Sequence, residues 1–383
     1  MQYQFELGPI RPPSEARSLL LRITRNCPWN KCEFCSSYKG TRFEIRTVEE
    51  VKEDIRIAQK IATDIKELSK NTGYDSEINR EFMVSVFRRS QYYTSEHYTH
   101  IAWWLFMGGK TVFIQDANSL VMNIDDLDEI LQFIKETFPS VERITTYARA
   151  KTVSKIETQN LMRLHDAGLS RIHIGLETGY DPLLVFINKG VTAQEHVDAG
   201  IKVKKAGISL SEYVILGLGG KKWSQEHALA TAEVLNKINP DFIRMRTLAL
   251  APRMAMYQKL QSGEFEMLLE DEIIEEEKLF IEELNGITSH VASDHVLNLL
   301  EEVEGKLPED KLKMLETIDQ YLTMPHEMRL NFKIGKREGL YRRLSDQLNN
   351  TLYETVERRI QVFKESDPKH VENLLLASRG GFI

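Results

Sequence analysis

Short apolar runs alternate with amphipathic stretches six times between Leu19 and about Leu250, and this alternation constrains the fold more than any other feature. The strand-like runs are residues 19–24, 111–115, 144–147, 171–175, 213–218 and 241–245. The stretches between them carry apolar side chains at helical spacing, and several of them end near a glycine or a proline. Repeated strand–helix units predict parallel strands joined by right-handed crossovers. We therefore expect an α/β fold, a partial (β/α)6 barrel of parallel strands.

The same patterns divide the chain into three regions. We expect an N-terminal extension over residues 1–18, a core over 19–252 and a mostly helical C-terminal extension over 253–383. An aromatic-rich insertion at about 68–108 interrupts the core; it predicts a helical cover with its own small core, and the alternative is a lid or substrate wall. Residues 264–283 include ten acidic side chains, which indicates a solvated helix face rather than a binding site.

Composition narrows the partners and the location. The 383 residues are 42% hydrophobic and 28% charged, and 50 basic against 57 acidic residues give a net charge of −7. This acidic balance argues against a nucleic-acid partner. No run of about 18 apolar residues is present, so we expect no membrane span. The N-terminal residues lack the basic and apolar segments of a secretion signal, which predicts a cytoplasmic location.

All three cysteines lie within nine residues, at Cys27, Cys32 and Cys35, directly after the first predicted strand. Disulfides are rare in the cytoplasm, so this clustering indicates a ligand set. A structural zinc site needs four ligands, and the nearest downstream histidines lie beyond the first helix. A redox pair formed by Cys32 and Cys35 leaves Cys27 unexplained. A cubane iron–sulfur cluster on three thiolates, with one iron open to another ligand, accounts for all three; inert buried thiols are the remaining alternative.

The segment Cys27-Pro-Trp-Asn-Lys-Cys32-Glu-Phe34-Cys35 resembles the cluster-binding loop of the radical S-adenosylmethionine (SAM) enzymes. That loop is Cys-x3-Cys-x2-Cys with an aromatic residue before the last cysteine. Phe34 supplies the aromatic residue, although the first gap here has four residues instead of three. The resemblance implies that Phe34 lies near the cluster and the adenine of SAM, and a place in the core is its alternative role.

Polar residues follow the second predicted strand, in the sequence Gln115-Asp116-Ala117-Asn118. The segment resembles the one in radical SAM enzymes whose backbone and polar side chains bind the methionyl amino group of SAM. Gly-Gly-Glu is the commoner sequence at that position of the family. The alternative for Asp116 and Asn118 is a structural role in the turn at the end of the strand.

Two later segments extend the resemblance. Residues 174–179, Ile-Gly-Leu-Glu-Thr-Gly, resemble the Gly-Leu-Glu-Ser-Gly of the elongator-subunit, methylthiotransferase and coproporphyrinogen-oxidase branch, which implies that Glu177 contacts the ribose or methionyl part of SAM. Lys189 stands where a basic residue pairs with the methionyl carboxylate. Leu216 and Gly217 lie in a segment that resembles the family segment that packs on the adenine of SAM. A helix cap for Glu177 and a solvated loop cation for Lys189 are the alternatives.

The resemblance implies an oxygen-sensitive enzyme with one [4Fe–4S] cluster and SAM as its cofactors. Such an enzyme cleaves SAM to a 5′-deoxyadenosyl radical, which abstracts hydrogen from a substrate, here an unidentified small molecule. An electron donor such as flavodoxin or ferredoxin is implied as a partner. With no fourth cysteine, no auxiliary cluster is expected. The alternative is a non-catalytic chaperone or delivery protein on the same scaffold, like the haem chaperone related to coproporphyrinogen oxidase.

Candidate substrate contacts follow in the last predicted strand and beyond it. Arg244 and Arg246 alternate along that strand and so share one face, from which they would recognise a carboxylate or a phosphate. His290 and His295 come after another strand-like step. The alternatives are salt-bridged surface arginines and a helix cap at Ser293 or Asp294.

Overall fold

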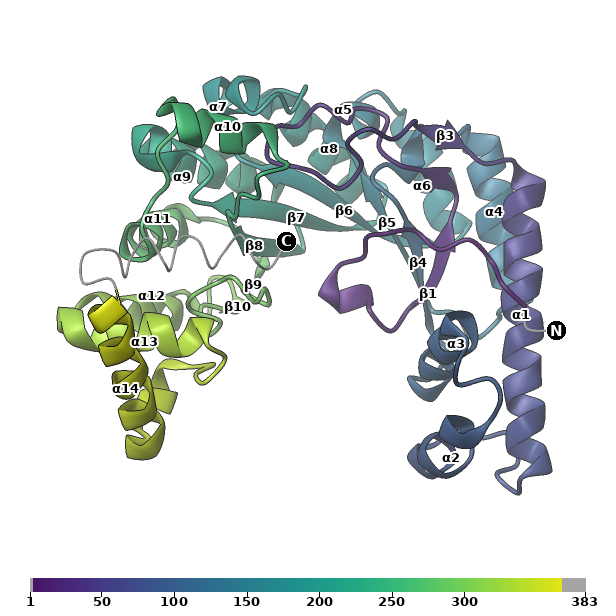
Figure 1. The fold of residues 1–383 in the computed structure, drawn as a ribbon. Helices are drawn as coiled ribbons and strands as arrows, with labels where there is room; N and C mark the ends of the chain where they lie inside the picture. Colours follow the sequence, from purple (N-terminus) through teal and green to yellow (C-terminus); the bar gives the residue numbers. More distant parts are fainter. Residues whose placement is uncertain (1–2, 367–383) are drawn as a thin grey trace. The chain divides into compact units, whose positions relative to one another are not determined.

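The computed structural model describes residues 3–366, and its elements divide into two compact units. The first unit comprises the chain up to Asn30 together with residues 37–174 and 201–210, and the second comprises residues 31–36, 175–200 and those from Ser211 onward. Each unit combines helices with mainly parallel strands (Figure 1). The predicted α/β class is thereby confirmed, whereas the predicted boundaries at residues 18 and 252 stay predictions.

Four parallel strands form the sheet of the first unit. Their order is β1 (Leu19–Arg22), β4 (Thr111–Gln115), β5 (Arg143–Ala148) and β6 (Leu169–Glu177), whose last three residues belong to the second unit. The strands are almost wholly buried, as expected for a parallel sheet. The register pairs Arg22 with Gln115, so the carboxyl ends of β1 and β4 are neighbours.

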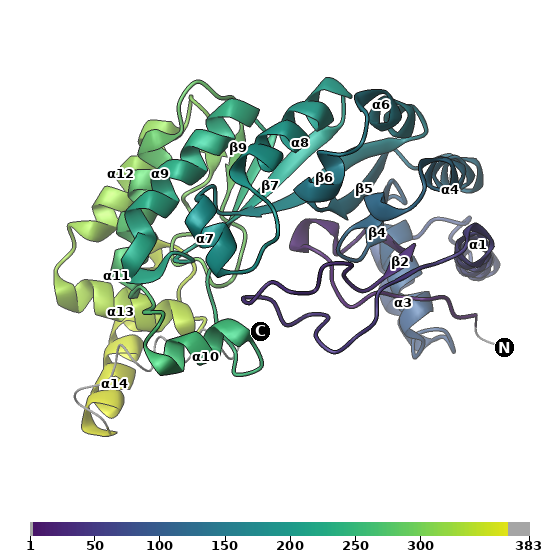
Figure 2. The same ribbon diagram turned by 90° about the horizontal axis from the view of Figure 1, so that it is seen from above.

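The helices of this unit pack in a row. Helix α1 (Val48–Asn71) contacts α4 (Ile124–Thr137), which contacts α6 (Thr158–Asp166), as Figure 2 shows; the short α5 (Ala150–Val153) follows β5. Helix α1 begins at a capping box: Glu50 N–H donates to Thr47 Oγ1 at 3.3 Å, and Thr47 N–H donates to the Glu50 carboxylate at 2.8 Å. The cap fixes the point at which the chain leaves the cysteine loop and becomes helical.

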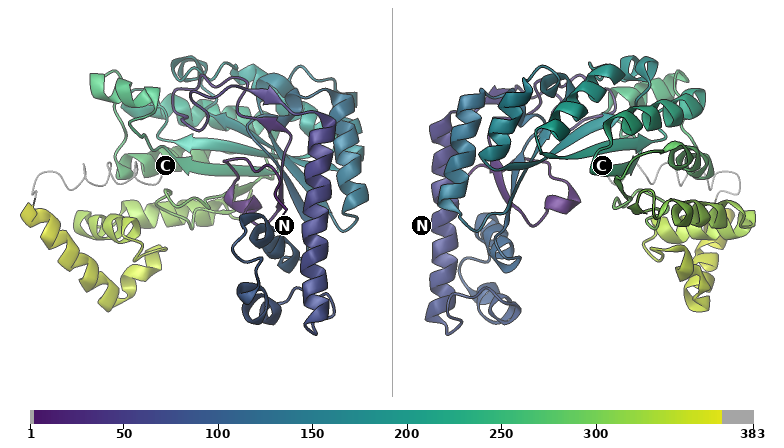
Figure 3. Two further views of the ribbon diagram at one scale, coloured as in Figure 1. Left: turned by 45° about the vertical axis from the view of Figure 1, so that its right-hand side comes forward. Right: turned by 180° about the vertical axis from the view of Figure 1, so that it is seen from behind.

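The aromatic insertion is helical, as predicted, and it packs beside α1 (Figure 3). It contains α2 (Arg80–Ser85), η2 (Phe87–Arg89) and α3 (Glu96–Phe106). Its rings form a small core, in which Tyr92 and Tyr98 stack with centroids 4.4 Å apart and Phe82 is fully buried. Trp104 Nε1 donates to the carbonyl of Thr111 at 2.9 Å, which ties the insertion to β4.

The second unit contains β7 (Ser209–Leu216, entered from the first unit), β8 (Phe242–Thr247), β9 (His290–Ala292) and β10 (Gly305–Lys306). Strands β7, β8 and β9 are parallel, and β10 is antiparallel to β9. The pairing of β9 with β8 adds a parallel strand to the six predicted ones. The sequence pattern placed a strand-like step just before β9 and did not count it among the six strands, because so few residues show no clear strand period.

The helices of this unit include the predicted C-terminal extension. They are α7 (Asp181–Phe186), α8 (Ala193–Lys205, which ends in the first unit), α9 (Gly220–Ile238), α10 (Ala255–Ser262), α11 (Glu270–Glu283), α12 (Lys311–Leu322), α13 (His326–Arg337) and α14 (Asn350–Ser366). Among the described residues, no helix combines the length and the apolar character that crossing a membrane requires.

Helix α11 corrects one expectation from the sequence. Its acidic run is not simply a solvated face, because α11 packs against both α9 and α12 and buries Glu270, Glu276 and Glu277 to 4%, 3% and 2% exposure. Arg337 pairs with Glu270 at 2.7 Å. Burial raises the pKa of Glu276 to about 7, and burial together with the charge of Glu276 raises the pKa of Glu277 to about 8.

Candidate functional site

The three cysteines lie in a loop closed by a short antiparallel ribbon. Strand β2 (Thr24–Arg25) pairs with β3 (Glu44–Ile45), and the chain between them forms the loop. Asn26 and Asn30 have positive φ values of 71° and 47°, a conformation that asparagine tolerates better than most residues. In the first unit the Asn30 N–H donates to Cys27 Sγ at 3.3 Å. The backbone therefore turns around the Cys27 thiol.

Residues 31–36 are anchored within the second unit, mainly through Glu33. Its N–H donates to the carbonyl of Ile187 at 2.9 Å, its carbonyl accepts the N–H of Met256 at 3.0 Å, and its carboxylate pairs with Lys259 at 2.7 Å. Phe34 packs against an apolar cluster that includes Ile187 and Met256. Two backbone hydrogen bonds of Glu33, one from its N–H and one to its carbonyl, therefore hold residues 31–36 in place.

The thiols suit the cluster that the sequence predicts. All three are free of disulfides and partly exposed, so a ligand can reach them, and thiolates are the usual ligands of iron–sulfur clusters. Over the described part of the chain, no three His, Cys, Asp or Glu side chains converge on a single metal ion. Thiolates that hold a cubane cluster bind separate iron atoms and need not converge in that way, whereas the ligands of a zinc ion must.

The segment after β4 is held by its own side chains. Asp116 is fully buried at φ 74°, and its carboxylate accepts from Arg22 Nε at 2.6 Å, the Asn26 N–H at 3.0 Å and the Tyr38 hydroxyl at 2.8 Å. Burial and the charge of Asp116 raise the pKa of Tyr38, which keeps its hydroxyl a donor. Asp116 thus binds the two parts of the cysteine loop that lie in the first unit, through Asn26 in one part and Tyr38 in the other.

Its two polar neighbours have similar structural partners. The Gln115 amide accepts the Gly8 N–H at 2.8 Å and donates to the Gly8 carbonyl at 3.0 Å. Asn118 donates to Thr152 Oγ1 at 2.8 Å and accepts a backbone N–H at 3.0 Å. Ala117 is the only one of the four predicted cofactor contacts here that is not buried. Direct contacts from the three polar side chains stay predictions, and Ala117 is the partly exposed residue of the segment.

Glu177 and Lys189 contact one another in the second unit. Lys189 Nζ lies 2.7 Å from Glu177 Oε1 and 5.6 Å from the centre of the Phe34 ring. The two predicted cofactor-binding side chains and the aromatic residue of the cysteine loop therefore lie together. Glu177 has φ 62°, a strained value for a non-glycine residue of the kind that concentrates at functional sites. A Cβ at Gly175 would overlap the Glu177 carboxylate, which explains the glycine there.

A fully buried carboxyl lies near this pair. Neither oxygen of Glu212, on β7, has a hydrogen-bond partner among the described residues. Burial, followed by the charge of Glu177, raises its pKa well above the ordinary value. The raised pKa favours the protonated, uncharged form of Glu212 beside Glu177 and Lys189.

A buried polar network joins the ends of β6 and β7. The His227 ring, on α9, donates from Nε2 to the carbonyl of Ile215 at 3.0 Å and accepts at Nδ1 from the Thr178 hydroxyl at 2.8 Å. Burial lowers the pKa of His227 to about 4, so the ring is neutral. Glu276 accepts the N–H of Gly217 at 2.6 Å and the Ser224 hydroxyl at 2.6 Å. The network holds the predicted ribose-binding and adenine-binding turns in one arrangement.

The predicted substrate contacts separate into two groups. Arg244 and Arg246 both pair with Asp294, at 2.8 and 2.9 Å, and the charge of Arg246 acts on His295, so these residues lie together. His290 pairs in register with Phe242, the first residue of β8, at the end of the strand opposite to Arg246. The His290 ring packs on that of Phe242 at 6.0 Å, and among the described residues no hydrogen bond or ion pair joins His290 to the arginines or to Asp294.

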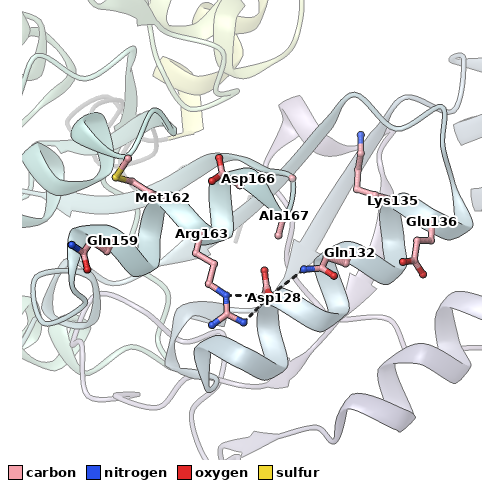
Figure 4. A pocket seen from close by; sticks show the side chains of 10 residues that line it. Asp128, Gln132, Lys135, Glu136, Gln159, Met162, Arg163, Asp166 and Ala167 are labelled. Carbon is pink, nitrogen blue, oxygen red and sulfur yellow. Dashed lines mark hydrogen bonds and ion pairs between the residues drawn. The ribbon is translucent and has the colours of Figure 1, made fainter.

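A pocket of about 750 Å³ lies elsewhere, between α4 and α6 (Figure 4). Arg163 crosses it to Asp128, at 2.8 Å. None of the residues predicted to bind cofactor or substrate lines it, so the pocket is not part of the candidate site.

Sequence reasoning missed three residues of the site. Glu276 was hidden in an acidic run that resembles a solvated helix face, and His227 is a lone histidine in a helix, so neither carried a signal. Asp294 stood beside His295 in the sequence and was expected to cap a helix. Only the packing shows that its partners are Arg244 and Arg246.

Comparison with known proteins gives a match over the same part of the chain. A family model described as the radical SAM superfamily matches residues 21–233, more than half of the 383 residues. Among solved structures, coproporphyrinogen III oxidase (HemN) from Escherichia coli aligns with 70% of this chain and 52% of its own, with a TM-score of 0.45 and 15% identity.

Two curated relatives share shorter stretches. The heme chaperone HemW of Buchnera aphidicola subsp. Acyrthosiphon pisum is 25% identical over 169 residues, which are 42% of this chain and 43% of the relative. The tRNA uridine(34) acetyltransferase of Methanocaldococcus jannaschii is 23% identical over 109 residues, 28% of this chain and 20% of the relative. The chain thus spans less than half the length of either relative that it matches.

Proposed function

The chain belongs to the radical SAM superfamily, and from that membership we propose that it is an enzyme that removes a hydrogen atom from a small-molecule substrate. A [4Fe–4S] cluster and SAM are its cofactors. When both are bound, they supply a 5′-deoxyadenosyl radical, while the protein supplies position, orientation and shielding from water. In this proposal the protein works in the cytoplasm with a reductant such as flavodoxin or ferredoxin.

The residue roles in this proposal follow from the contacts described above. Cys27, Cys32 and Cys35 hold the cluster as thiolates. Lys189, already placed by Glu177, neutralises the methionyl carboxylate of SAM. The observation that carries the proposal is that Lys189 Nζ lies 5.6 Å from the centre of the Phe34 ring, and Phe34 is part of the cysteine loop.

Backbone groups make the remaining proposed cofactor contacts. The backbone at Ala117, a partly exposed residue, binds the methionyl amino group, because the neighbouring polar side chains already have protein partners. Leu216 and the Gly217 turn lie against the adenine, in the position that Glu276 fixes through the Gly217 N–H. Phe34 closes the apolar side of the site.

Anaerobic reconstitution with iron and sulfide tests the proposal. We expect about four irons per chain and 5′-deoxyadenosine when dithionite and SAM are added. Cys32→Ala should lose the cluster, measured as bound iron and visible absorbance. The matched control is Ser36→Ala, a change of one small side chain in the same loop, which should keep the iron. If the wild-type protein holds no cluster, or makes no 5′-deoxyadenosine, the enzyme proposal is wrong.

A second candidate is a delivery protein that binds the cofactors without turning them over. The observation that favours it is the match to a heme chaperone over 169 residues. Labelled metabolite extracts separate the two candidates, because an enzyme transfers deuterium from a substrate into 5′-deoxyadenosine. Haem that binds stoichiometrically, with no deuterium transfer from any extract, would favour the delivery protein.

A further inference from the structure

Two arginines of the second unit share a single carboxylate. Arg244 Nη1 donates to Asp294 Oδ2 at 2.8 Å, and Arg246 Nη1 donates to Asp294 Oδ1 at 2.9 Å. The side chains of Arg244 and Arg246 are only 8% and 14% exposed, whereas that of Asp294 is 33% exposed. Two nearly buried cations therefore face one partly exposed anion.

This group has one unbalanced positive charge. No second carboxylate among residues 3–366 forms an ion pair with either guanidinium. His295 is neutral, because burial and the charge of Arg246 lower its pKa to about 4. Burial alone would raise the pKa of Asp294, but the hydrogen bond from Arg246 and both charges hold it below its ordinary value. A desolvated cation without a counter-ion is unfavourable, so the site favours an added anion.

The same arginines have donors to spare. Arg244 Nε and Arg246 Nη2 are buried and have no hydrogen-bond acceptor in the described part of the chain. Rings flank the pair: Tyr213 lies 5.0 Å from the Arg246 guanidinium and Phe242 lies 5.6 Å from that of Arg244. These rings hold the guanidinium planes but accept no ordinary hydrogen bond. An oxyanion would satisfy the free N–H groups.

The strand register places the arginine pair on the cofactor side of the sheet. Arg246 pairs with Ile215 on the parallel strand β7, so their side chains lie on one face. Ile215 packs against the same apolar cluster as Phe34 of the cysteine loop. Strand β8 ends one residue after Arg246, beside the end of β7 that leads into the Gly217 turn.

We propose that Arg244 and Arg246 bind a carboxylate group of the substrate. The inference rests on the proposed function, because it places that group beside the cofactors. A carboxylate is planar, carries one negative charge and accepts two parallel hydrogen bonds, which matches one excess positive charge and two free donors. A phosphate monoester carries about 1.5 to 2 negative charges at neutral pH and would leave buried negative charge.

Fluorine NMR of the cluster- and SAM-loaded protein tests this proposal. The probes are 3,3,3-trifluoropropionate, a carboxylate, and monofluorophosphate, a phosphate-like dianion. We expect saturable binding of trifluoropropionate that is about tenfold weaker in Arg246→Gln, which corresponds to ~1.4 kcal/mol. Arg342→Gln removes an arginine that also pairs with a carboxylate but is 81% exposed, and it should bind the probe like the wild type.

Two further variants separate ligand binding from a structural ion pair. Asp294→Asn removes the competing carboxylate and should bind trifluoropropionate several-fold more tightly, whereas a purely structural pair would show only lost stability. Arg246→Lys keeps the positive charge but loses the planar guanidinium that can donate two parallel hydrogen bonds. It should therefore weaken trifluoropropionate binding, and it serves as the test if the Gln variant fails to fold.

The outcomes are distinct. Equal probe binding in the wild type and in Arg246→Gln, or no binding by the wild type, overturns the site. Tighter binding of monofluorophosphate than of trifluoropropionate overturns the carboxylate assignment. If trifluoropropionate binds through the pair but no 5′-deoxyadenosine forms, the proposed function fails and the anion site stands. If 5′-deoxyadenosine forms but the probe does not bind, only the present inference fails.

Discussion

Lys189 is the side chain that we propose for binding the methionyl carboxylate of SAM. It is held by Glu177 at 2.7 Å, and its side chain is only 11% exposed. The cost of ordering and desolvating the ammonium group is therefore met when the protein folds, not when SAM binds. The raised pKa of Glu212 favours its uncharged form, which limits the negative charge beside this ion pair.

Lys189→Ala is expected to leave the cluster intact and to weaken SAM binding about tenfold or more, since a charge-assisted hydrogen bond is lost. Bound iron and calorimetric titration with SAM measure the two effects separately. Lys237→Ala is the matched control, because Lys237 also pairs with a glutamate but is half exposed on α9. Unchanged SAM affinity in Lys189→Ala would remove Lys189 from the site.

Helix α11 holds the Gly217 turn through one buried carboxyl and also buries a second carboxyl, which lowers the stability of the fold. Packing against α9 and α12 brings Glu276 to the Gly217 N–H, but it also buries Glu277 to 2% exposure. A carboxyl whose folded pKa is raised stabilises the fold below its unfolded pKa of 4.5, and that contribution is lost as the pH rises through the folded pKa. For Glu277 the window runs from about pH 4.5 to 8.

Glu277→Gln should therefore raise the free energy of unfolding above pH 8 by on the order of 5 kcal/mol, since the pKa is raised from 4.5 to about 8 and each unit corresponds to ~1.4 kcal/mol. The difference from the wild type should shrink as the pH falls towards 4.5. Denaturant unfolding at several pH values measures it. Glu275→Gln, on the exposed face of the same helix, should change the free energy of unfolding little at any pH. A pH-independent difference would contradict the raised pKa.

Over the whole molecule, cofactor binding and stability are expected to be coupled. The cysteine loop between β2 and β3 has few regular backbone hydrogen bonds, and the cluster adds ligand bonds at three of its residues. A ligand that binds only the folded chain raises its stability by mass action. Loss of the cluster, by oxygen or by a chelator, should lower Tm by several degrees.

Hydrogen exchange shows where this coupling acts. Amides of residues 26–43 should exchange faster after cluster removal, while those of β4 and β5 should change little. Protein stripped of SAM alone is the control and should keep the loop protected. Equal protection of the loop with and without the cluster would mean that the protein alone orders it.

The sequence alone determined the fold class, the six main strands and the class of cofactor. Those features depend on local pattern: alternating strand and helix periods, a capping box at Thr47, and three cysteines in nine residues. Chain-local spacing is enough for them because each element carries its own signal. The fold could therefore be predicted well, apart from β9, which is too short to show a period.

Tertiary structure alone decided how the polar side chains are used. It buried Glu276 and Glu277, occupied the Gln115 and Asp116 side chains with protein contacts, and placed Arg244 and Arg246 on one carboxylate. Ion pairs join residues as many as 226 positions apart, as Lys259 and Glu33 do. Charge compensation depends on distances across such contacts, and neither residue type nor spacing along the chain contains them.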